Sequence, residues 1–157
     1  DERLIDHFPG QGEITTTRES IVDKEAGMTS TEQKVAIVTG ASRGIGAGVV
    51  EGYRTHGYAV VATSRSITAP DDPLVLTVAG DLAEPETAGR VVDAALERFG
   101  RVDTLVNNAG MFIAKPFTEY TPEDFATKIS LNLAGFFYVS QNAIRQMLTR
   151  GGGHVVN

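Results

Sequence analysis

A short glycine-rich turn is the feature that most constrains the fold of this 157-residue chain. The turn reads TGASRGIG at residues 39–46 and follows the apolar run KVAIV at residues 34–38. A short run rich in Val and Ile that ends at glycine is typical of a buried strand. The residues from 44 to 56 are typical of a helix, although two interior glycines weaken it. A strand that turns at glycines into a helix begins a βαβ unit, so the chain is predicted to form a parallel α/β sheet.

The rest of the chain repeats this alternation of short apolar runs and amphipathic segments. Strands are predicted at 34–39, 58–63, 74–80 and 102–107 and from residue 154; helices are predicted at 44–56, at 85–99 and from 121 to about 150. Strands that alternate with helices predict right-handed crossovers and a parallel sheet covered on both faces. The ten residues 64–73 contain two prolines and are predicted to be a loop. The sequence stops soon after the fifth strand begins, so we expect a truncated sheet.

The first 30 residues differ from the remainder. They are polar, of mixed charge and without helix or strand periodicity, so residues 1–30 are predicted to be a disordered or non-native leader. Met28 lies just ahead of the first strand and is a candidate translation start, with an ordinary disordered tail as the alternative. Residues 31–157 are predicted to form the folded domain.

The glycine turn has the composition of an anion site. Glycines permit positive φ and let a ligand approach the backbone, while free N–H groups and the helix dipole favour negative charge. Ser42 adds a hydroxyl group and Arg43 adds a positive charge. The turn lacks the Gly-Lys-Ser/Thr of nucleoside triphosphatases, so we predict a pyrophosphate site of another kind. An ordinary tight turn is the alternative.

Composition excludes several classes of protein. A formal net charge of -6 argues against a nucleic-acid or anionic membrane surface, and no apolar run approaches the roughly 18 residues of a membrane helix. The chain has no cysteine, and its three histidines are scattered without a second ligand at suitable spacing, so no metal site is predicted. No secretory signal pattern is visible, and a cytoplasmic location is expected.

Three sequence motifs resemble those of the classical short-chain dehydrogenases/reductases. TGASRGIG matches the glycine turn of that family, NNAG at residues 107–110 matches its second hallmark, and Asp81-Leu82 looks like the pair beside the adenine. The resemblance covers about residues 33–157 and implies a Rossmann-like doubly wound sheet, with an NAD(P) coenzyme across the carboxyl ends of its strands. The residues that the resemblance assigns to the coenzyme are Gly40, Ser42, Arg43, Gly44, Ile45, Gly46, Arg65, Asp81, Leu82, Asn108, Ala109 and Gly110.

The end of the second strand predicts which coenzyme is preferred. An acidic residue there would accept hydrogen bonds from the ribose hydroxyls of NAD, but this chain has Ser64 followed by Arg65. Arg65 and Arg43 can flank a 2′-phosphate with charge-assisted hydrogen bonds. We therefore predict a preference for NADP(H), with NAD(H) and a merely solvated Arg65 as the alternatives.

Asn132 is the one candidate catalytic residue. It shares a predicted helix face with Phe125, Ile129 and Phe136, and this stripe is expected to press on the sheet. A buried amide on such a stripe needs hydrogen-bond partners, and an ordinary core asparagine is one interpretation. In the family that the chain resembles, an asparagine about this far beyond NNAG orders a water that relays protons.

The family's other catalytic residues, a serine and a Tyr-x-x-x-Lys pair, have no match in the sequence. None of the four tyrosines has a lysine four residues later. The resemblance thus implies an NADP-dependent oxidoreductase acting on a carbonyl/alcohol pair, of which this chain alone is expected to be inactive. A non-catalytic nucleotide-binding module and an S-adenosylmethionine-dependent methyltransferase are the rival interpretations.

The long helix also carries apolar residues away from the predicted stripe. These are Leu131, Leu133, Phe137 and Val139. A helix that is apolar on two sides usually packs against a second partner. In the family this surface joins subunits, so a homodimer or homotetramer is predicted.

Overall fold

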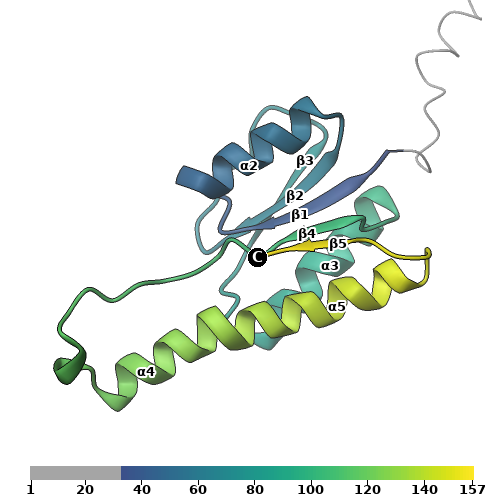
Figure 1. The fold of residues 1–157 in the computed structure, drawn as a ribbon. Helices are drawn as coiled ribbons and strands as arrows, with labels where there is room; N and C mark the ends of the chain where they lie inside the picture. The colour runs from purple at the N-terminus through teal and green to yellow at the C-terminus, as the bar shows by residue number, and fades with distance from the viewer. Residues whose placement is uncertain (1–32) are drawn as a thin grey trace, which may run out of the picture.

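A single parallel sheet organises the protein. A computed structural model describes residues 33–157, so the predicted leader and the candidate start Met28 lie outside the described residues. Five strands lie in the order β3-β2-β1-β4-β5, and all four strand pairs are parallel (Figure 1). Their bounds are Val35–Thr39 for β1, Ala59–Ser64 for β2, Val75–Ala79 for β3, Thr104–Val106 for β4 and His154–Val156 for β5.

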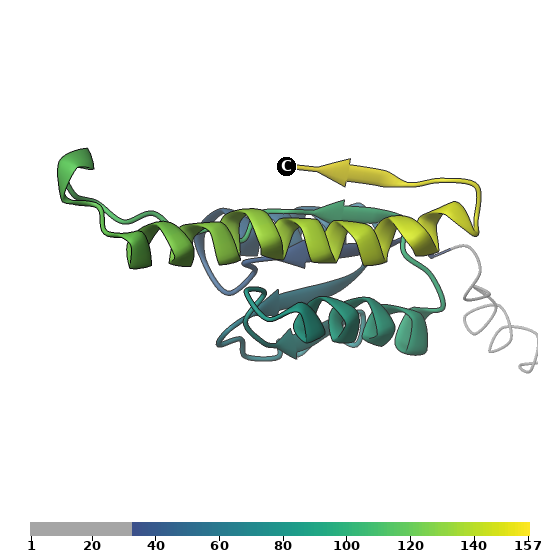
Figure 2. The same ribbon diagram turned by 90° about the horizontal axis from the view of Figure 1, so that it is seen from below.

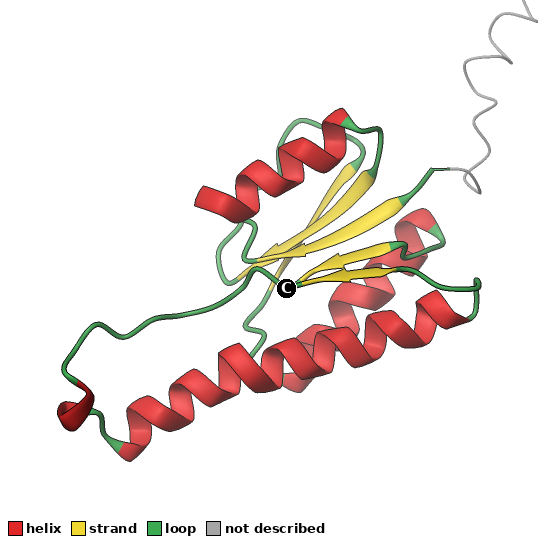
Figure 3. Ribbon diagram, in the orientation of Figure 1, coloured by secondary structure: helices red, strands yellow, loops and turns green. Residues whose placement is uncertain are grey.

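Helices cover both faces of this sheet, as Figure 3 shows by colour. Their bounds are Gly44–Thr55 for α2, Pro85–Phe99 for α3, Pro122–Ile129 for α4 and Phe136–Leu148 for α5; the π-helical turn η2 spans Ser130–Gly135 and the short 3₁₀ helix η1 spans Phe117–Glu119. Helix α2 lies on one face, and α3 and α5 lie on the other (Figures 1 and 2). The predicted Rossmann-like, doubly wound α/β sheet is therefore confirmed.

The strand order reverses beside β1. From β1 the chain builds outward through β2 to β3, then returns to place β4 on the opposite side of β1. The connections that leave the carboxyl ends of β1 and β4 go to opposite faces of the sheet, and an open crevice forms at such a switch point. The glycine turn follows β1 and the NNAG segment follows β4, so both motifs meet at this crevice.

The core consists of one apolar cluster on each face of the sheet. Every residue of β1 is buried, as expected for a strand covered on both faces. The larger cluster packs α3 and α5 on the sheet, and it includes Val91, Val92 and Ala95 from the predicted face of α3, with Phe99 packed against it. The smaller cluster packs α2 on the other side. Burial of these side chains from water is the main force that holds the layers together.

The segment predicted to be one helix from 121 to about 150 is interrupted by η2. It begins as predicted, with Thr121 as N-cap, Pro122 in the first turn and a capping box completed by Asp124. The six residues of η2 then adopt i→i+5 geometry, which inserts extra backbone and rotates the later residues about the helix axis.

The predicted sheet-facing stripe on this segment was wrong. Phe125, Ile129, Asn132 and Phe136 are all exposed, whereas Val139, expected on another face, is fully buried with Gly135, Ala143 and Met147. Two causes act together. The π-helical turn changes the register, and α4 extends past the carboxyl ends of the strands, where no sheet lies beneath it (Figures 1 and 2).

Residues 65–73 form a loop as predicted, whereas Ser64, predicted to begin the loop, still belongs to β2. One ion pair fixes the end of this loop on α2. Arg54 Nε lies 2.8 Å from Asp72 Oδ2, and the Leu74 N–H donates to Asp72 Oδ1 at 2.9 Å. The Arg54 hydrogen bond, and then the Leu74 N–H, hold the pKa of Asp72 below its ordinary value of 3.8.

We expect Asp72→Asn to destabilise the protein in a pH-dependent way. A carboxyl whose pKa is lowered by folding stabilises the folded state above its unfolded pKa of about 3.9, and that stabilisation is lost as pH falls through the folded pKa. Urea midpoints should therefore be lower for the variant at about pH 7 and should converge with those of the unaltered chain as the pH falls below the lowered pKa of Asp72. Asp71→Asn, at the exposed neighbour, is the matched control. A difference between the urea midpoints of Asp72→Asn and the unaltered chain that stays constant down to acidic pH would contradict this account.

Candidate functional site

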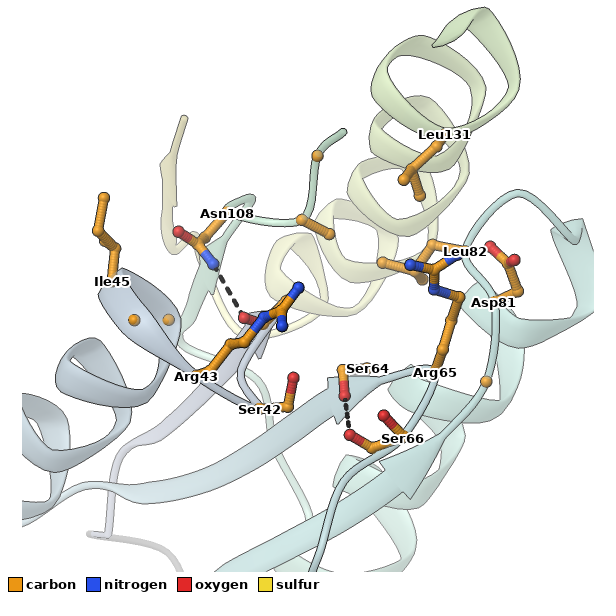
Figure 4. A pocket seen from close by; sticks show the side chains of 16 residues that line it. Ser42, Arg43, Ile45, Ser64, Arg65, Ser66, Asp81, Leu82, Asn108 and Leu131 are labelled. Atoms are coloured by element: carbon orange, nitrogen blue, oxygen red, sulfur yellow. Dashed lines mark hydrogen bonds between the residues drawn. The ribbon is translucent and has the colours of Figure 1, made fainter. Parts of the chain in front are cut away.

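A cavity of about 670 Å³ lies at the carboxyl ends of the strands (Figure 4). It is lined by every residue that the sequence assigned to a coenzyme: Gly40, Ser42, Arg43, Gly44, Ile45, Gly46, Arg65, Asp81, Leu82, Asn108, Ala109 and Gly110. These residues come from the ends of four separate strands, β1 to β4, and from the first turn of α2. The fold thus gathers positions that are up to 70 residues apart in the sequence into one wall.

Two glycines allow the parts of this wall to approach one another. Gly40 has a φ of 65°, and a Cβ there would lie 2.9 Å from the Ala109 Cα. A Cβ on Gly46 would lie 2.2 Å from the Gly40 carbonyl oxygen and 2.6 Å from the Asn108 amide nitrogen. Side chains at these positions would force α2 away from β1 and β4, so the cavity requires glycine at both.

The amino end of α2 faces the cavity with its backbone N–H groups. Within the described chain, its N-cap residue Arg43 makes no side-chain capping hydrogen bond and its first turn carries no acidic residue. Uncapped N–H groups and the positive end of the helix dipole suit a bound anion. The wall contributed by the glycine turn is therefore electropositive, with the Arg43 side chain exposed beside it.

Asn108 joins the end of β4 to the glycine turn. Its side-chain amide donates to the Thr39 carbonyl at 2.9 Å and to the Gly40 carbonyl at 3.2 Å. The Thr39 hydroxyl accepts from the N–H groups of Asn108 at 3.0 Å and Ala109 at 2.9 Å, and it donates to the Val106 carbonyl at 3.2 Å. These bonds link the ends of the neighbouring strands β1 and β4.

Asn107 makes a second link of this kind on the other side of β4. Its side-chain amide donates to the Ser140 hydroxyl of α5 at 3.0 Å and to the Asn157 side chain beyond β5 at 2.9 Å. The first asparagine of NNAG therefore ties β4 to β5 and α5, whereas the second ties β4 to β1.

Two guanidinium groups and one carboxylate set the charge of the cavity. Arg43 and Arg65 are exposed and rise from different strand ends, Arg65 beside Leu82 (Figure 4). Asp81 also lines the wall, where its Oδ1 accepts from the Ala83 N–H at 3.0 Å. Ser64 occupies the end of β2, and its hydroxyl donates to the Ser66 carbonyl at 2.9 Å. The end of β2 therefore offers a cation and hydroxyl groups but no acid.

Four lining residues were not assigned from the sequence: Ser64, Ser66, Gly80 and Leu131. The first three adjoin assigned residues at strand ends, so their positions carried a usable signal. The position of Leu131 could not be inferred in this way, because Leu131 belongs to the π-helical turn η2 and not to a strand end. That turn comes close to the cavity because Gly135 is small; a Cβ on Gly135 would lie 2.8 Å from the Leu82 carbonyl oxygen.

Asn132 lies next to Leu131 but does not line the cavity. Its side chain is exposed, and it accepts from the Met111 N–H and donates to the Met111 carbonyl, both at 2.9 Å. Its Oδ1 is 3.6 Å from the position that a Cβ on Gly110 would occupy. The expected buried amide was therefore wrong, and Asn132 instead fixes the backbone that leaves the cavity wall.

Neither a cluster of metal-binding side chains nor a membrane-spanning helix occurs within residues 33–157. No group of three or more His, Asp or Glu side chains there is arranged to hold a metal ion. No helix in that part of the chain combines the length and apolarity needed to cross a membrane.

Comparison with known proteins gives consistent matches. A family model described as short chain dehydrogenase matches residues 34–157. D-threitol dehydrogenase of Mycolicibacterium smegmatis is 34% identical over 134 residues, which are 79% of this chain and 51% of that protein.

Solved structures match equally well. A short-chain dehydrogenase from Streptomyces avermitilis superposes with a TM-score of 0.73 and 34% identity, over 80% of this chain and 48% of that one. L-sorbose reductase from Gluconobacter frateurii, complexed with NADPH and L-sorbose, gives a TM-score of 0.70 and 29% identity, over 78% of this chain and 51% of that one. This chain spans 51–60% of the length of the first three curated relatives that it matches.

Proposed function

The chain belongs to the short-chain dehydrogenase/reductase family, and from this premise we propose that its cavity binds NADP(H) for hydride transfer between the nicotinamide and a carbonyl/alcohol substrate. The observation that carries the proposal is that one cavity gathers all twelve residues assigned to the coenzyme. Residues 31–157 are proposed to form the NAD(P)-binding domain. When bound, the coenzyme would supply or accept the hydride.

The residues of the cavity suggest how each part of the coenzyme is held. The N–H groups of Gly44 to Gly46 and the Ser42 hydroxyl would donate to the pyrophosphate, which the dipole of α2 also favours. Arg43 and Arg65 would flank the 2′-phosphate. The complex of L-sorbose reductase with NADPH supports this choice by analogy, and NAD(H) is the alternative. The rest of the coenzyme, from the adenine and its ribose toward the nicotinamide, would contact the remaining lining residues Asp81, Leu82, Ala109 and Gly110.

A titration tests this binding directly. We expect NADPH fluorescence to rise on mixing with the chain, to saturate at one equivalent, and to do so at lower concentration than for NADH. S-adenosylmethionine should not compete. Competition by S-adenosylmethionine without any response to either nicotinamide coenzyme would support the rival methyltransferase interpretation.

Asn132 is proposed to serve catalysis by positioning. Its amide fixes the Met111 backbone beside Gly110, and an oriented water in that region could then relay protons. Hydride transfer to a carbonyl also needs a hydroxyl group that donates a proton to the substrate oxygen. The 157 residues contain no Tyr-x-x-x-Lys, the motif that supplies this group in the family. A non-catalytic nucleotide-binding module is the alternative function, because it would use the same cavity residues.

We predict that the 157-residue chain alone does not catalyse the reduction of carbonyl compounds by NADPH. NADPH mixed with the chain and a panel of ketones and aldehydes should keep its near-ultraviolet absorbance, because no residue of the sequence matches the family's proton donor. A full-length relative with its own substrate serves as the positive control. Any reproducible loss of absorbance above the rate without protein would refute the prediction.

A homo-oligomer, a cytoplasmic location and a small-molecule substrate remain parts of the proposal. For oligomerisation the support is an exposed apolar surface on η2 and α5 that includes Leu133, Phe136 and Phe137. Sedimentation at several concentrations tests it, since a monomer throughout would count against this surface as a subunit contact.

A further inference from the structure

The connection between β4 and α4 is held along the helix that follows it. We name residues 111–121 of this connection the strap. The strap and α4 project together past the carboxyl ends of the strands (Figures 1 and 2). Three side chains on α4 and η2 contact the strap, namely Asp124, Lys128 and Asn132, and they follow one another at intervals of four residues. Side chains four residues apart lie on one helical face, so one face contacts the strap at three successive turns. We call each of these three contacts a grip.

The two outer grips are conventional polar contacts. Asp124 forms an ion pair with Lys115 and accepts from the Thr121 N–H at 2.8 Å. Asn132 bonds both backbone groups of Met111, each at 2.9 Å. These contacts fix the two ends of the strap, one at the start of α4 and one at the cavity wall.

Lys128 makes the middle grip, and it contacts both ends of the strap. Its ammonium nitrogen donates to the Tyr120 hydroxyl at 3.2 Å and lies 4.5 Å from the centre of the Tyr120 ring. The same nitrogen lies 5.4 Å from the centre of the Phe112 ring. The Tyr120 hydroxyl in turn donates to the Ile113 carbonyl. A cation between two aromatic rings attracts both, so Lys128 draws residues 112 and 120 toward α4.

The strap is continuous with the proposed coenzyme site. Gly110, the residue before it, lines the cavity, as does Leu131, the residue before Asn132. We propose that Lys128 is a positioning residue for this site, which keeps the strap closed on α4 and thereby holds Gly110 and Met111 in place. This inference rests on the proposed coenzyme binding. If the coenzyme binds only when the strap is closed, bound coenzyme must lower the open fraction.

Cleavage of the strap by chymotrypsin measures how often it opens. Phe112 and Phe117 are 81% and 89% exposed, and cleavage after them yields products that begin at residues 113 and 118. Lys128→Met keeps a long apolar side chain but removes the charge. We expect cleavage to become about three- to tenfold faster, because the loss of a cation–π contact raises the open fraction by that order.

Three further variants separate the grip from general destabilisation. Lys128→Arg keeps a cation over the rings and should restore slow cleavage, and Tyr120→Phe keeps the ring without the hydroxyl and should fall between. Lys34→Met removes an equal charge from a lysine 5.9 Å from the centre of the Tyr58 ring, so it should leave strap cleavage unchanged. Circular dichroism verifies that each variant is folded. Equal cleavage rates for Lys128→Met and the unaltered chain would overturn the grip.

Added NADPH tests the coupling to the site. Saturating NADPH should slow strap cleavage in the unaltered chain and in Lys128→Met, whereas a purely structural contact would not respond. Binding that leaves cleavage unchanged would overturn the positioning role. A fluorescence titration run in parallel shows whether the coenzyme binds at all; a flat titration overturns the proposed function and with it the coupling, while the variant series still decides the grip.

Discussion

Replacing Arg65 with Asp is expected to reverse the coenzyme preference. The guanidinium of Arg65 lines the cavity just beyond the end of β2, and the last residue of that strand, Ser64, carries no negative charge. A charge-assisted hydrogen bond to phosphate contributes about 1.5–3 kcal/mol, which corresponds to about a tenfold to a hundredfold loss of NADPH affinity when it is removed. The new carboxylate would also accept hydrogen bonds from the ribose hydroxyls of NADH, so affinity for that coenzyme should rise.

Parallel fluorescence titrations with NADPH and NADH measure the reversal. Arg150→Asp makes the same change of charge at an exposed residue beyond the end of α5. Because that residue does not line the cavity, it should leave both affinities within about twofold, as screening predicts for distant surface charges. Tighter binding of NADH than of NADPH by the unaltered chain would show that the assignment of the coenzyme is wrong.

The second large effect is expected at Gly46. A Cβ at this position would lie 2.2 Å from the Gly40 carbonyl oxygen, which belongs to backbone and cannot rotate away. We expect Gly46→Ala to lower the free energy of unfolding by about 1–3 kcal/mol, as overpacking of a rigid site does. NADPH affinity should fall at least about tenfold, because the shift of α2 moves the N–H groups that would hold the pyrophosphate.

Gly48 provides a control on the same helix. Nothing lies within 4 Å of a Cβ placed there, so Gly48→Ala should raise stability by up to about 1 kcal/mol through its better helix propensity. Urea unfolding and NADPH titration on both variants separate the close contact from helix propensity. Similar stabilities for the two variants would contradict the close approach of α2 to the glycine turn.

Strands and turns could be predicted from the sequence because buried parallel strands are continuous apolar runs bounded by glycine. The same regularity located the cavity. Parallel strands end at one edge of the sheet, so residues after β1, β2, β3 and β4 had to converge. All twelve assigned residues therefore line a single wall.

The strap and η2 could not be predicted in the same way. A π-helical turn differs from an α-helical turn by one residue of backbone and leaves no distinct pattern in SLNLAG. A stripe counted at 3.6 residues per turn therefore placed Asn132 and Phe136 on the wrong face. The contacts of the strap could not be predicted from the sequence either, because they join a loop to a helix through single side chains such as Lys128.

The strand order has a consequence for the path of folding. β1 pairs with β2 across a short stretch of chain, but the bond from Asn108 to Thr39 joins residues 69 apart. Closing that longer loop costs more chain entropy, so the β1–α2–β2 half is expected to assemble before β4 docks. The crevice takes shape only at that last docking step. A ligand seated there would contact residues that follow β1 to β3 as well as residues that follow β4, and would accordingly slow the separation of the two halves.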